Sequence, residues 1–248
     1  VLDGTNSTAN SGNSRGAGTG GAFDLRAGGI LNLTDVTLQN FRANEGGAIY
    51  IGDPQSIVTG TNVILDNNIA NTRGGAIRNA SFFSTLTLTD STISNNEATN
   101  EHGGGIYNNG QATFTRVNVT DNTTLDHVPN TDNKQDSGWG AGVFNEGGVL
   151  TWTDGTVSGN NAFGYGGGYF GNNGSQLNAT NVTFDGNAAI RASTATPGSL
   201  NNGVLADDVH GSGLAINTGS IANLTNVTIQ NHTAGVNNGG TITGEGAG

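Results

Sequence analysis

The chain has 248 residues, of which 33% are hydrophobic and only 11% are charged. Its formal net charge is −11, so nucleic acid and anionic lipid would both be repelled, and we expect neither partner. The absence of cysteine excludes disulfides and thiolate metal sites, and no apolar run approaches the roughly 18 residues that a membrane helix needs.

Two sequence phrases alternate along the chain. The first joins glycines to a short apolar stretch, as in GGAIYI, and its copies begin at Gly20, Gly46, Gly74, Gly103, Gly140, Gly166 and Gly211. The second alternates apolar and polar residues before asparagine, as in LNLTDVTLQN, and its copies cover residues 31–40, 59–68, 86–96, 112–122, 150–161, 177–187 and 221–231. Each pair of phrases predicts one structural unit of short strands and tight corners.

Recurring positions in the second phrase give the length of this unit. A threonine occupies one position in every copy: Thr34, Thr61, Thr89, Thr115, Thr153, Thr180 and Thr225. An apolar residue always follows four positions later: Leu38, Leu65, Ile93, Val119, Val157, Phe184 and Ile229. Most intervals between these apolar residues are 26 to 28 residues, and the two longer ones, 38 and 45, predict loop insertions near residues 122–140 and 188–212.

A period of this length without helical periodicity is typical of one coil of a β-solenoid. A leucine-rich repeat would need regular leucines and a helical segment, and a propeller blade would need roughly 40 to 50 residues. We therefore predict an all-β fold, a single right-handed parallel β-helix of about eight coils, with residues 1–248 forming one domain.

The phrases GGAIYI, GGGIYN and TISNNEATNEHGGGIYN resemble the repeats of right-handed parallel β-helix proteins. In particular, they are similar to polymorphic outer-membrane adhesins and to bacterial surface proteins with Gly-Gly-Ala-Ile and Asn-rich repeats. The resemblance covers roughly residues 20–240 and implies the fold and an extracellular or cell-surface, prokaryotic location. It does not select a function, because adhesins, lyases, tailspikes and structural filaments share this fold.

We interpret the glycine runs as corners of the coil, because no helix follows them and glycine reaches positive φ without strain. Ile106 is expected in an interior ladder with Ile49, Ile77 and Val143, and Tyr107 is expected to point outward. Asparagines are expected to stack at left-handed turn positions, with calcium binding as the minor alternative. These positions are Asn40, Asn67, Asn95 and Asn231, with Asp121, Gly159 and Gly186 in the other copies.

A second polar column lies two residues before the threonine column: Asn32, Thr59, Thr87, Thr113, Thr151, Asn178 and Asn223. Strand alternation places both columns on one side, so we expect a flat Thr/Asn-x-Thr array outside the core. A solvated sheet face is the first interpretation. Ice binding and packing against a neighbouring rod are the alternatives.

The two insertions hold the residues that most resemble an active site. Asp207, Asp208 and His210 in the second insertion could perform acid–base hydrolysis of a glycan, but the Arg-x-Lys of pectin-degrading β-helix enzymes is missing. The first insertion carries Trp139 and candidate calcium or interface residues without a DxDxDG register: Asp126, Asp132, Lys134 and Asp136. We interpret both as solvated loops and expect no catalytic, cofactor or metal-binding residue.

Neither residues 1–20 nor residues 235–248 contain a pattern for a capping amphipathic helix. Open solenoid ends expose strand edges that tend to associate. We therefore expect a non-enzymatic extracellular structural protein, a subunit of a surface filament or appendage that assembles by head-to-tail stacking. The alternatives are an adhesin or autotransporter-like passenger that contacts a surface glycan or host cell, a carbohydrate-active enzyme and an ice-binding protein.

Overall fold

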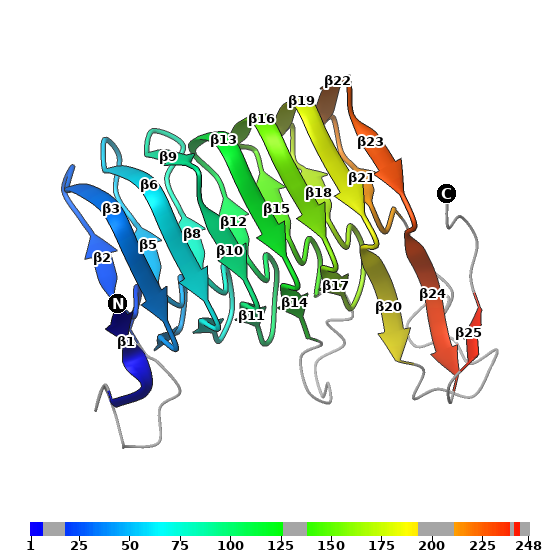
Figure 1. The fold of residues 1–248 in the computed structure, drawn as a ribbon, viewed down its shortest axis with the longest axis horizontal. Coiled ribbons are helices and arrows are strands. Elements are labelled where there is room, and N and C mark those ends of the chain that lie inside the picture. The colour runs from blue at the N-terminus through cyan, green and yellow to red at the C-terminus, as the bar shows by residue number, and fades with distance from the viewer. Residues whose placement is uncertain (7–17, 126–137, 193–210, 239–240, 244–248) are drawn as a thin grey trace.

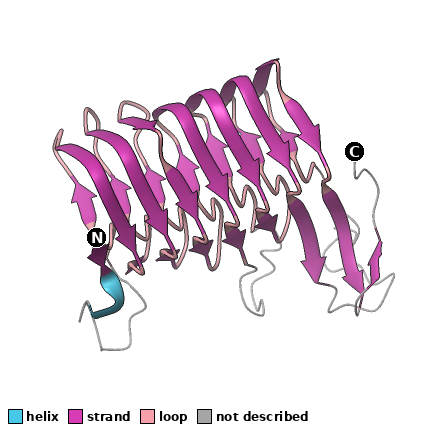
Figure 2. Cartoon of the chain, in the orientation of Figure 1, coloured by secondary structure: helices cyan, strands magenta, loops and turns pink. Residues whose placement is uncertain are grey.

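The computed structural model describes residues 1–6, 18–125, 138–192, 211–238 and 241–243 (Figure 1). This part of the chain contains strands and one 3₁₀ turn, η1 (Gly4–Asn6), and no α-helix (Figure 2). None of its helical segments is long and apolar enough to cross a membrane. The all-β class predicted from the sequence is confirmed.

The strands form three sheets, which the chain visits in a fixed order. Sheet 1 contains β1 (Leu2–Asp3), β3 (Ile30–Gln39), β6 (Ile57–Asp66), β9 (Thr85–Thr89), β10 (Thr92–Ser94), β13 (Gln111–Thr120), β16 (Val149–Ser158), β19 (Gln176–Asp185), β22 (Ile221–Thr225) and β23 (Thr228–Gln230). Sheet 2 contains β4 (Arg42–Ala43), β7 (Ile69–Ala70), β11 (Glu97–Ala98), β14 (Thr123–Thr124), β17 (Asn161–Ala162), β20 (Ala188–Ala192), β24 (Thr233–Asn238) and β25 (Thr241–Thr243). Sheet 3 contains β2 (Phe23–Leu25), β5 (Ile49–Ile51), β8 (Ile77–Asn79), β12 (Ile106–Asn108), β15 (Val143–Glu146), β18 (Tyr169–Asn172) and β21 (Leu214–Ile216).

Each turn of the chain adds one row to each sheet. From β3 the chain passes to β4, β5 and then β6, which pairs in parallel with β3. The same order repeats up to β24, and among the described strands only β25 pairs antiparallel, with β24 (Figure 1). These stacked parallel sheets are consistent with a parallel β-helix.

The core lies between the sheets and is built from columns of apolar side chains. In sheet 1, Leu38 pairs with Leu65, and Leu65 with Ile93, and all three are fully buried. In sheet 3, Ile106 pairs with Ile77 and Val143, as the sequence predicted. The predicted interior ladder at Ile106 is therefore confirmed, and the recurring apolar residues at Leu38 form another.

Glycine makes the corner before each strand of sheet 3. The first glycine of every copy of GGAIYI and its relatives has a positive φ, for example 60° at Gly46. The second approaches the next coil closely, because a Cβ on Gly47 would lie only 2.0 Å from the carbonyl oxygen of Gly75. The glycine runs are thus corners, as predicted, and stacking of the coils limits side-chain size there.

The long strands of sheet 1 bend at one residue of left-handed conformation. This residue directly follows the recurring threonine, with φ between 50° and 58°: Asp35, Asn62, Asp90, Arg116, Asp154, Asn181 and Asn226. The extra residue resets the alternation, so Leu33 and Leu38 both point inward although an odd number of positions separates them. The bend explains how an outward threonine and an inward apolar residue can be four positions apart.

A ladder of buried asparagines runs along the corner between sheets 1 and 2. Its members are Asn68, Asn96, Asn122, Asn160 and Asn187. The backbone N–H and the Nδ2 of Asn96 both donate to Oδ1 of Asn122, and its Nδ2 also donates to the carbonyl of Leu65. Sequence reasoning expected stacked asparagines one residue earlier, at Asn40, Asn67 and Asn95. Those residues have left-handed φ as predicted, and Nδ2 of Asn67 donates to Oδ1 of Asn40 at 2.6 Å. The buried ladder is formed by the residues that follow them and was not predicted.

Candidate functional site

The acidic and basic residues predicted in the insertions lie outside the described residues: Asp126, Asp132, Lys134, Asp136, Asp207, Asp208 and His210. In chain order, the first insertion falls between β14 and β15 and the second between β20 and β21. Within the described part of the chain, no group of three or more histidine or acidic side chains could hold a metal ion. Two outer surfaces of the described chain carry regular columns of side chains, one on sheet 1 and one on sheet 3.

The first surface is the outer side of sheet 1 before the bend, which we call the threonine face. It consists of the two polar columns predicted from the sequence, and each member pairs in register with its counterpart in the next coil. Its residues are Asn32, Thr34, Thr59, Thr61, Thr87, Thr89, Thr113, Thr115, Thr151, Thr153, Asn178, Thr180, Asn223 and Thr225. All of them are exposed or half-buried, which confirms the predicted array outside the core.

The hydroxyl groups of the threonine face have no protein partner among the described residues. Asparagines link two coils at its C-terminal end, where Nδ2 of Asn223 donates to Oδ1 of Asn178 at 2.9 Å. Along the bend next to the face, the side chains do pair between coils, as in the double hydrogen bond from Arg116 to Asp90. The threonine hydroxyls therefore face solvent, whereas the adjacent column holds the coils together.

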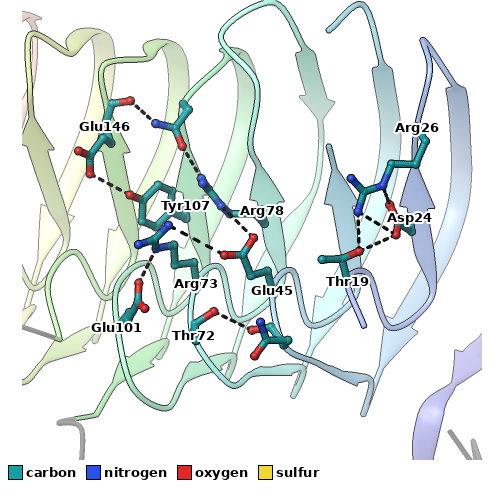
Figure 3. A network of polar contacts seen from close by, with 12 residues as sticks. Thr19, Asp24, Arg26, Glu45, Thr72, Arg73, Arg78, Glu101, Tyr107 and Glu146 are labelled. Atoms are coloured by element: carbon teal, nitrogen blue, oxygen red, sulfur yellow. Dashed lines mark hydrogen bonds and ion pairs between the residues drawn. The ribbon is translucent and has the colours of Figure 1, made fainter. Parts of the chain in front are cut away.

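The second surface is the outer side of sheet 3, where a charged network lies over the middle coils (Figure 3). Arg73 bonds to Glu101 and lies 4.0 Å from Glu45, and Nε of Arg78 lies 3.7 Å from the same Glu45 carboxylate. The Arg78 guanidinium stands 3.9 Å above the Tyr107 ring. Each of these side chains comes from a different coil or corner, so the network joins successive turns of the chain.

Tyr107 is the centre of this network. Its hydroxyl donates to Oε2 of Glu146 at 2.8 Å, and the whole residue is only 4% exposed. Burial raises the pKa of its phenol, and burial lowers the pKa of the Arg78 guanidinium, which nevertheless stays protonated. The prediction that Tyr107 points outward is correct, but the side chain is buried because residues from the glycine corners cover it.

Further along sheet 3 the network becomes aromatic. Phe144 and Phe170 follow Tyr107 in the same outward column, and their rings stack with centroids 5.3 Å apart. The rings of His102 and Trp139 cover them from the corner before each strand, with His102 4.6 Å from Phe144 and 4.9 Å from Trp139. Burial, together with the charge of Arg73, lowers the pKa of His102 to about 3.

The first strands of sheet 3 carry a smaller polar group (Figure 3). Nε of Arg26 donates to Asp24 at 2.7 Å and its Nη2 donates to Thr19 at 2.8 Å. The guanidinium also lies 4.6 Å from the centre of the Tyr50 ring. Charged and aromatic contacts therefore extend along most of this face.

The charged groups of the sheet 3 network bond to one another within the chain. The carboxylates of Glu45 and Glu101 face arginine, and that of Glu146 accepts from tyrosine, so each is engaged by a neighbouring coil. Sequence reasoning missed this network. The sequence does contain a sign of it. The residue directly before the first glycine of a corner is charged or aromatic in the coils where the outward column of sheet 3 is covered: Glu45, Arg73, His102 and Trp139.

The chain matches no protein-family model, no curated protein and no solved structure. The resemblance to surface-protein repeats therefore stays a prediction, and a shared fold alone does not assign a function.

Proposed function

We propose that the chain is a single right-handed parallel β-helix that serves as a non-enzymatic extracellular structural protein, a subunit of a prokaryotic surface filament or appendage. The observation that carries this proposal is that the buried polar side chains bond from one coil to the next. The buried asparagines and the charged network of sheet 3 are engaged along the long axis, where they join one coil to the next. Right-handed connections between parallel strands are strongly favoured because of strand twist, which supports the proposed handedness.

Assembly is supported by the last strands of sheet 1. Leu224 and Ile229 continue columns that are buried in the preceding coils, yet each is 41% exposed. At the other end, β1 pairs only with Leu38 and Gln39 of β3. Within the described residues, the first half of β3 therefore has no strand on that side, and β22 of a second copy could pair there in the same register.

Sheet 2 limits this contact. The antiparallel strand β25 covers the C-terminal edge of β24, so a second copy cannot simply continue sheet 2 in parallel. The expectation of fully open ends is corrected accordingly. The proposed contact between copies uses sheets 1 and 3, where the described edges have the parallel geometry of the interior.

The test compares two exposed apolar residues that have the same exposed fraction. Leu224, at the proposed contact, and Ile64, in the middle of sheet 1, are both 41% exposed. We expect the wild-type chain to form concentration-dependent linear assemblies in sedimentation velocity and electron microscopy. Leu224→Arg should abolish them because it places a charge in an apolar contact, and Ile64→Arg should not.

Two results would contradict assembly. A wild-type chain that stays monomeric at all concentrations would reject the filament subunit and favour the adhesin-like passenger. Equal loss of assembly in Leu224→Arg and Ile64→Arg would place the contact elsewhere on the molecule. Circular dichroism of all three proteins checks that the fold is retained.

A further inference from the structure

The threonine face differs in charge from the rest of the surface. A third outward column lies beside it on the same strands: Ile30, Ile57, Thr85, Gln111, Val149, Gln176 and Ile221. None of the residues in these three columns is charged or aromatic, although the chain as a whole has a net charge of −11. A charged ligand would find no opposite charge within these three columns, and sugar recognition by ring stacking has no aromatic side chain to use there.

The face is also periodic in two directions. Neighbouring coils are separated by roughly 4.8 Å, and the two columns by roughly 6.6 Å, which is two residues along a strand. Four successive coils carry threonine in both columns, from Thr59 and Thr61 in β6 to Thr151 and Thr153 in β16. A ligand can occupy all of these positions together only if it repeats in two directions as well.

The threonine side chains are suited to holding such a ligand without reorganisation. Threonine is branched at Cβ, so few rotamers are available and little entropy is lost when the side chain is fixed. Each hydroxyl can donate one hydrogen bond and accept two, and the described protein uses none of these on the threonines of the face. The methyl groups beside the hydroxyls restrict the positions that water can take.

We infer that the threonine face binds the ordered surface of ice. Ice is neutral, repeats in two directions on the scale of a few ångströms, and offers both donors and acceptors at every lattice point. The inference is independent of the proposed structural function, because it concerns the side of the rod and not its ends.

The experiment measures ice growth with the full chain and two matched variants. Wild-type protein should separate the freezing point from the melting point and give faceted ice crystals under the microscope. Thr113→Tyr, in the centre of the face, should lower this thermal hysteresis several-fold because the ring lifts the face from the lattice. Thr183→Tyr lies on β19 after the bend, outside the face, and should keep the wild-type value.

Three outcomes would overturn the inference. These are the absence of thermal hysteresis and of ice shaping in the wild type, equal loss in both variants, or self-association that only Thr113→Tyr removes. The last result would identify the face as a contact between copies of the chain. Melting curves of the variants show whether a loss of activity reflects a loss of fold.

Discussion

The outer sides of sheet 1 and sheet 3 show two uses of an outward strand position. On the threonine face, outward side chains stay in contact with solvent, and their hydroxyls make no bond to the described protein. On sheet 3, outward Tyr107 and Phe144 are 4% and 1% exposed, because side chains from the preceding corner lie over them. Strand alternation decides which side of a sheet a residue occupies, but the side chains of neighbouring coils decide whether the residue is exposed to solvent there.

The comparison predicts the largest difference in stability at Phe144. Phe144→Ala removes a ring packed between His102 and Phe170 and leaves a cavity, so we expect the free energy of unfolding to fall by about 3–5 kcal/mol. Denaturant titration measures the change. Phe83→Ala is the control, because Phe83 is 69% exposed and its removal should change little. Similar small losses at both positions would show that the outer side of sheet 3 is not a second core.

A smaller effect is expected from acid. The folded-state pKa of His102 is lowered from 6.5 to about 3, so the unfolded chain takes up a proton first as the pH falls below 6.5. Stability from this group is constant above that pH and falls on the way to pH 3, by at most about 1.4 kcal/mol per pH unit, and by less because His102 is partly exposed.

Denaturant titrations at pH 7 and pH 5 measure this loss, and His102→Phe keeps the ring stacking without the titration. The difference between wild type and variant isolates His102 from His232, whose pKa burial also lowers. An equal pH dependence in the two proteins would mean that His102 is as accessible to protons as in the unfolded chain.

The smallest effect is expected on the threonine face. Thr115→Ala should change the free energy of unfolding by no more than about 0.5 kcal/mol, because the hydroxyl has no partner in the described protein and the site is only half-buried. Thermal and denaturant melts are sufficient to measure it. A loss near that of Phe144→Ala would show that the face is needed for the fold, and the contrast between the two sheets would disappear.

Much of the backbone arrangement could be read from recurring residues. The glycine corners, the threonine columns and the apolar columns at Leu38 and Ile106 were all predicted, because each repeats at the period of the coil. The bend at Asp35 and its equivalents was not recognised, although an aspartate or asparagine follows the recurring threonine in six of the seven copies. The buried asparagine ladder was not predicted, because runs such as Asn67-Asn68 and Asn95-Asn96 do not show that the second member is buried.

The sequence by itself determined the all-β class, the length of the coil and the positions that form columns, because parallel stacking places equivalent residues of successive repeats next to one another. Only the tertiary structure decided what each column does. Residues Arg73 and Tyr107 lie far apart in the chain and in different phrases, so no repeat pattern shows that one covers the other. The threonine columns repeat just as regularly and remain exposed or half-buried, because no corner residue of the described chain covers the part of the sheet 1 strands before the bend.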